Sequence, residues 1–121
     1  YYLLFYMLSK QRRIPKEIFE KVLKGGINTN SEHLYLRFTK NLDVLRPDEK
    51  DSRFTFVISG KIAKRAVDRN LFKRRGRHII KKNLEKIKEG YLCAFFAKKG
   101  VVELSFKELE QEVLFLLDKI K

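Results

Sequence analysis

The sequence predicts an α+β fold, a sandwich in which helices cover one side of a small sheet and the other sheet face stays open. Three observations predict it: two short segments that alternate apolar and polar residues, an apolar run at 91–97, and a basic segment with helical spacing between them. The predicted elements follow the order α-β-β-α-β-α and share one core. A chain of 121 residues suffices for one domain with one modest core.

The first helix is predicted over about ten residues, from Pro15 to the Gly25-Gly26 pair, because proline suits a first helical turn and glycine commonly ends a helix. Strands are predicted at 34–38 and 54–58, where every second residue is apolar. The apolar side chains expected to face the core are Leu34, Leu36, Phe38, Phe54, Phe56 and Ile58. The charged stretch 40–51 is expected to be a loop that joins these strands as antiparallel neighbours.

A third strand is predicted at 91–97, between Gly90 and a turn at 98–100. The last helix begins with a capping box, in which Ser105 and Glu108 satisfy each other's backbone amides. One apolar stripe follows and is expected to pack on the core: Phe106, Leu109, Val113, Leu116, Leu117 and Ile120.

The net charge of +13 is concentrated in two segments. Residues 10–24 hold six basic against two acidic residues, and residues 61–82 hold ten basic residues against Asp68 alone. The rest of the chain is balanced. Charge localised in this way predicts a binding face for an anionic partner: a nucleic acid, an anionic membrane or an acidic protein.

The second basic segment is predicted to be a helix from Ile62 to about Lys88. Basic residues recur at every fourth position, a stripe that drifts by about 40° per step: Arg65, Arg69, Lys73, Arg77 and Lys81. Like charges at this spacing destabilise a helix unless phosphates neutralise them, and arginine is the better phosphate ligand. The expected buried side is Ala63, Val67, Leu71, Ile80, Leu84 and Ile87. Because that side is needed for the core and carries no Trp, nucleic acid is favoured over a membrane.

The single cysteine, Cys93, lies in the apolar run and is expected to be buried, without a disulfide or a zinc site, as suits the cytoplasm. Residues 1–8 are all apolar or aromatic, but are too short to span a bilayer and lack the features of a signal peptide. Because Met7 could be the natural start, we interpret residues 1–6 as an extension and residues 7–121 as a single RNA-binding domain. The alternative is a strand or arm that packs on the domain.

The segment 63–77, AKRAVDRNLFKRRGR, resembles the signature helix of the protein component of bacterial ribonuclease P. The match departs at Leu71, where the family usually has a second Arg, and at Gly76 inside the helix. Residues 8–14 resemble the family's basic N-terminal arm, 18–26 its first helix and 53–61 the strand before the signature. The resemblance covers about residues 8–120.

The resemblance implies a ribosomal-protein-like fold and a ribonucleoprotein that removes the 5′ leader from precursor tRNA. In that family the RNA subunit is the catalyst and binds the magnesium, while the protein binds this RNA and the leader. Carried onto this chain, the residues for the RNA subunit are Lys64, Arg65, Arg69, Asn70, Lys73, Arg74 and Arg77, with Arg12 and Arg13 of the arm. Those for the leader are Phe19, Tyr35 or Arg37, Val57 and Lys61, where Phe19 and Tyr35 would stack on unpaired bases unless they serve ordinary packing.

The sequence offers no constellation for a nuclease that works without RNA. Asp68 is the one acid of the basic helix before Glu85, and neither His33 nor His78 has the neighbours of a metal ligand. We therefore expect no catalytic residue, no protein-bound metal and no small-molecule cofactor. The alternatives are a general RNA-binding module, such as a ribosomal protein or an assembly factor, and, less favoured, a DNA-binding module.

Overall fold

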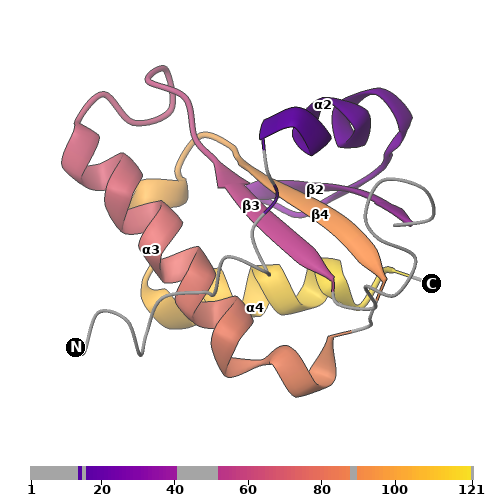
Figure 1. Cartoon of the computed structure of the whole chain (residues 1–121). Coiled ribbons are helices and arrows are strands. Elements are labelled where there is room, and N and C mark those ends of the chain that lie inside the picture. Colours follow the sequence, from indigo (N-terminus) through magenta and orange to yellow (C-terminus); the bar gives the residue numbers. More distant parts are fainter. Residues whose placement is uncertain (1–13, 15, 41–51, 88–89, 121) are drawn as a thin grey trace, which may run out of the picture.

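The structure, a computed structural model, describes residues 14, 16–40, 52–87 and 90–120. Within them the order is α2 (Lys16–Gly25), β1 (Ile27–Asn30), β2 (Leu34–Lys40), β3 (Arg53–Val57), α3 (Ala66–Lys82), β4 (Tyr91–Ala97) and α4 (Phe106–Leu117). Short 3₁₀ turns at Leu84–Lys86 and Val101–Glu103 follow α3 and β4. The predicted α+β class is confirmed (Figure 1). The interpretation of residues 1–6, like Arg12 and Arg13, lies outside the described residues.

The sheet has the strand order β1-β2-β4-β3, which corrects the predicted pairing. β4 lies between β2 and β3, antiparallel to the first and parallel to the second, so β2 and β3 are not neighbours. The physical reason is burial. Residues 91–95 of β4 are buried on both sheet faces, and only a central strand is covered in this way.

A fourth strand, β1, forms where no strand was predicted. It pairs with β2 at the edge of the sheet, and its four residues, Ile27–Asn30, are mostly exposed. A short polar edge strand has no alternation of apolar residues, so its sequence carries no strand signal.

The core side of the sheet is as predicted. Leu34, Leu36, Phe38, Phe54, Phe56 and Ile58 are all buried and form one cluster with residues of α3 and α4. The capping box of α4 is also confirmed: Glu108 N donates to Ser105 Oγ at 3.2 Å, and Ser105 N donates to Glu108 Oε1 at 3.0 Å.

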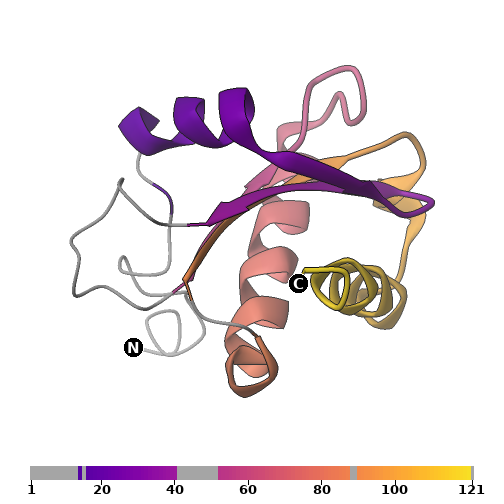
Figure 2. The ribbon, with the colours of Figure 1, turned by 90° about the vertical axis from the view of Figure 1, so that its right-hand side faces the viewer.

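The helices cover both faces of the sheet, which corrects the expectation of an open face (Figure 2). α3 and α4 pack on the face of Leu34 and Leu36. α2 lies on the other face, where its Val22 is buried against Leu92 and Ala94 of β4. The even-numbered residues of β4 are apolar as well as the odd ones, so the strand needs cover on both sides.

The basic helix is shorter than predicted, and its expected buried side is confirmed only in part. Ala63 and Ile80 are buried, and Leu84 and Ile87 pack against the core. α3 spans Ala66–Lys82, and its buried residues are Phe72, Gly76, Ile79 and Ile80. Val67, expected in the core, is 55% exposed. Cys93 is buried as predicted, and this burial raises the pKa of its thiol. No helix within the described ranges has the length and apolar character needed to cross a membrane.

Candidate nucleic-acid interface

The outer surface of α3 and the loop before it carries most of the residues predicted to bind an RNA subunit. Lys64, Arg65, Asn70 and Arg74 are exposed, and Arg69, Lys73 and Arg77 are half-buried. Arg65 and Asp68 lie 3.9 Å apart in an exposed pair, which leaves the arginine available because such pairs contribute little. The cations of α3 therefore face solvent over much of the helix.

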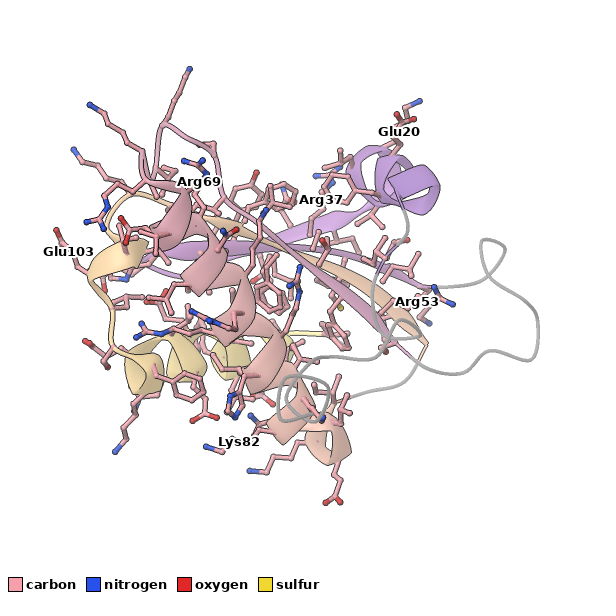
Figure 3. All side chains as sticks on the ribbon, turned by 60° about the vertical axis from the view of Figure 1, so that its left-hand side comes forward. Glu20, Arg37, Arg53, Arg69, Lys82 and Glu103 are labelled. Atoms are coloured by element: carbon pink, nitrogen blue, oxygen red, sulfur yellow. The ribbon has the colours of Figure 1, made fainter. Side chains whose placement is uncertain are left out.

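Arg69 also has a structural task. Its Nη1 donates to the backbone carbonyls of Ala63 and Lys64, both at 2.8 Å, and so holds the loop that leads into α3. Figure 3 shows this side chain at the N-terminal end of the helix. Because the same guanidinium holds the backbone at Lys64, replacing Arg69 would also disturb the placement of Lys64.

A groove of about 280 Å³ runs between α2, β3 and α3. Figure 1 shows β3 passing between these two helices. The groove is lined by Ile14, Phe19, Thr55, Phe56, Val57, Ile58 and Lys73. Two of the residues predicted for the leader, Phe19 and Val57, thus lie in one groove with Lys73 of the basic helix.

Half-buried aromatic rings extend from this groove across the sheet. Phe19 lies 6.1 Å from Phe96 between ring centroids, and Phe96 stacks on Tyr35 at 4.6 Å with the rings nearly parallel. The strand register explains the row, because Tyr35 pairs with Phe96 and Phe96 with Val57. Phe19 and Tyr35 therefore pack in part, and they still present ring surface to solvent.

Phe96 is a site residue that the sequence analysis missed. The run 91–97 was predicted to be a strand with no role in binding assigned to it, yet Phe96 is half-buried and links Phe19 to Tyr35. The available signal was its place near the strand end, on the face opposite to Cys93 and Phe95.

A second groove, of about 390 Å³, lies over β1 and β2 and is lined by Leu23, Asn28, Asn30, Tyr35 and Arg37. Arg37 is largely committed to structure: its Nε donates to Val22 O at 3.0 Å, and its Nη1 donates to Asn28 Oδ1 at 2.9 Å. Its side chain points toward α2 and thus fastens the last turn of that helix to β2 (Figure 3). Of the alternatives Tyr35 and Arg37, Tyr35 offers the stacking surface.

Lys61 is exposed in the turn after β3 and lines neither groove. The predicted leader residues are therefore divided: Phe19 and Val57 lie in the first groove, Tyr35 and Arg37 in the second, and Lys61 apart from both. Within the part of the chain that the structure describes, no group of three or more His, Cys, Asp or Glu side chains is placed to hold a metal ion.

Comparison with known proteins places these features in context. Residues 8–121 match the family model described as Ribonuclease P. The chain is 36% identical to the ribonuclease P protein component of Alkaliphilus oremlandii over 114 residues, which cover 94% of each chain. It is 31% identical to that of a Cyanothece species, with 93% of this chain and 95% of the relative covered.

Solved structures agree in fold. The ribonuclease P protein of Thermotoga maritima superimposes with a TM-score of 0.78 at 25% identity, covering 90% of this chain and 97% of that one. The protein of Staphylococcus aureus gives a TM-score of 0.77 at 19% identity, covering 91% and 95%.

Proposed function

The chain belongs to the ribonuclease P protein family, the protein component of a ribonucleoprotein endoribonuclease, and from that premise we propose that it binds two RNAs. The exposed cations of α3 and its preceding loop bind the catalytic RNA subunit. The groove between α2, β3 and α3 binds the 5′ leader of precursor tRNA and so promotes removal of the leader.

The observation that carries the proposal is the meeting of Phe19, Val57 and Lys73 in one groove. A single strand that enters it finds aromatic surface for its bases and a cation for its phosphates. Stacking of this kind tolerates different sequences, because every base has a π-face, and is worth about 1–3 kcal/mol per base. From Phe19 in this groove, the row of half-buried rings runs through Phe96 to Tyr35, which offers stacking surface for more than one base.

Arg69, Asn70, Lys73, Arg74 and Arg77 match the family's signature, and Lys64 and Arg65 extend the same surface. Lys73 stands where the two proposed surfaces meet, because it belongs to the signature and also lines the groove. The leader and the RNA subunit would accordingly be held side by side, on adjoining faces of α3.

Magnesium is assigned mainly to the RNA subunit. Mg²⁺ prefers carboxylate and phosphate oxygens, whereas residues 61–82 contain Asp68 as their one acid. A protein surface of this composition favours phosphates and disfavours bare divalent cations. We also expect a cytoplasmic location, which the buried free thiol of Cys93 suits.

Reconstitution with a bacterial ribonuclease P RNA tests the proposal. The protein with RNA should process precursor tRNA correctly at lower magnesium and salt than the RNA alone, and the protein freed of RNA should not cleave. Phe19→Ala should weaken the binding of precursor tRNA by about tenfold while sparing that of mature tRNA, because one stacking contact is lost.

Phe115→Ala is the matched control, since this ring is 50% exposed on α4, outside the proposed surfaces. If Phe19→Ala lowers thermal stability but leaves the ratio of precursor to mature affinity unchanged, Phe19 is a packing residue and the leader assignment is wrong.

A further inference from the structure

The turn between β1 and β2 is tied to α4 by the carboxylate of Glu112. Ser31 Oγ donates to Glu112 Oε1 at 2.6 Å, and the backbone amide of His33 donates to the same oxygen at 2.8 Å. The other oxygen, Oε2, lies 2.6 Å from His33 Nδ1. An ionised carboxylate only accepts hydrogen bonds, so the ring hydrogen must reside on Nδ1.

The same turn is held from the end of β4. Lys98 Nζ donates to Ser31 O at 2.9 Å, and the Lys98 backbone amide donates to His33 O at 2.9 Å. Gly100, with φ +90°, passes so close to the His33 ring that a Cβ there would lie 3.2 Å from Cδ2. Segments far apart in the sequence thus converge on two turn residues, Ser31 and His33.

These contacts bear on the second groove, which lies on the opposite face of the sheet from α4. Asn30 comes directly before the turn and Tyr35 comes shortly after it, and the two are register partners that line this groove. Tyr35 in turn stacks on Phe96. The position of the turn therefore decides where both side chains stand.

The register of β1 has little support from burial. The strand is four residues long, and Ile27, Asn28 and Asn30 are all exposed. A strand without a buried face is weakly specified, and a slip of one residue would turn all its side chains to the other face. Such a slip would remove Asn28 and Asn30 from the groove. The hydrogen bond from Arg37 to Asn28 supports the register along β1, and the contacts at the turn support it at the Asn30 end.

We propose that Glu112 is a positioning residue for the RNA-binding groove of Asn30 and Tyr35: it holds Ser31 and His33, and thereby fixes the register of β1, from the far side of the sheet. The inference rests on the proposed function, because Tyr35, which ends the aromatic row proposed to stack on the leader, lines this groove. Glu112 contacts no RNA in this account. Its effect reaches the substrate through the turn.

The test uses the complex reconstituted with ribonuclease P RNA and measures the ratio of precursor to mature tRNA affinity. Glu112→Ala should lower this ratio by about tenfold and Ser31→Ala by about threefold, as expected for lost hydrogen bonds to a charged group. Glu112→Gln keeps an acceptor for Ser31 and should restore part of the ratio. The double variant should lose no more than Glu112→Ala alone, since both changes break the same contact.

Glu110→Ala is the matched control. Glu110 lies on the same helix, but it accepts hydrogen bonds from Asn83 and Lys82 on the α3 side, so the ratio should stay at the wild-type value. Affinity for the RNA subunit should be unchanged in all variants. If Glu112→Ala weakened binding of the RNA subunit as much as it lowered the precursor-to-mature ratio, the cause would be general unfolding, and the positioning role would be overturned.

A wild-type ratio of one would overturn the proposed leader site, and this inference with it. A wild-type ratio above one that Glu112→Ala retains would overturn the positioning role alone and leave the leader site standing.

Discussion

Gly76 of α3 lies directly against the ring of Phe56 on β3. A Cβ built on Gly76 would stand 2.7 Å from Cγ of Phe56, closer than side chains tolerate. Phe56 in turn stacks on Phe95 of β4 at 4.9 Å between centroids. Helix propensity alone would make Gly76 a destabilising residue in α3. The structure shows that it is the point at which the helix approaches the sheet.

Gly76→Ala should therefore destabilise the protein, although alanine is the better helix former. Overpacking a filled core typically costs about 1–3 kcal/mol, which exceeds the roughly 1 kcal/mol gained in helix propensity. Thermal unfolding measures the result as a lowered Tm. Gly60→Ala is the control, because a Cβ at Gly60 meets nothing within 4 Å. A Tm for Gly76→Ala at or above that of wild type would show that Phe56 moves aside freely.

Charge reversal on α3 should separate phosphate binding from structure. Arg74 is exposed, so Arg74→Glu should weaken RNA-subunit binding and lower the salt slope by roughly one, with no loss of Tm. Arg69→Glu should do the same and also lower Tm, because its bonds to Ala63 and Lys64 are lost. Lys107→Glu on α4 is the control. Equal affinity losses for Lys107→Glu and Arg74→Glu would mean that RNA binding depends on the net charge of the protein and not on particular contacts of α3.

The carboxylate of Glu112 should make stability depend on acid pH. Burial raises its pKa, but hydrogen bonds from Ser31 and His33 and the attraction of the His33 ring outweigh burial, so the pKa is lowered from the ordinary 4.5. A lowered folded-state pKa means that the stabilisation is present above about 4.5 and is lost as pH falls through the folded-state value. The Tm difference between wild type and Glu112→Gln should accordingly shrink as pH is lowered over the range below about 4.5. A difference that stays constant over this range would contradict the expectation.

Burial patterns decided how much of the fold was predictable. Leu34, Leu36, Phe54 and Phe56 alternate with partly exposed residues, so the core face of β2 and β3 follows from sequence. The pairing of those strands did not follow, because it depends on which strand is covered on both faces. The sequence of β4 contains that information, but only the packed structure shows that α2 supplies the second cover.

The candidate site shows the same division. The spacing of basic residues predicted the cations of α3. A sequence pattern does not show that the side chains of Arg69 and Arg37 donate hydrogen bonds to backbone carbonyls. Phe96 was missed because an aromatic residue in an apolar run is ordinarily core. The network of Ser31, His33 and Glu112 joins residues about eighty positions apart, a separation that no local pattern reports.

The central position of β4 has a consequence for how the chain acquires its fold. β4 is the last strand in sequence, yet it is the strand to which both β2 and β3 are bonded. During synthesis the whole of α3 leaves the ribosome before the strand that completes the sheet beneath it. Until Tyr91–Ala97 arrives, β3 lacks the one strand that pairs with it among the described residues, and Phe56 lacks the ring of Phe95 on which it stacks. Before β4 is synthesised, the basic helix lacks part of the core on which it packs. Repulsion between its like charges opposes helix formation during that time. Ordering of the basic helix α3 is thereby coupled to a late, long-range step, the docking of a single strand.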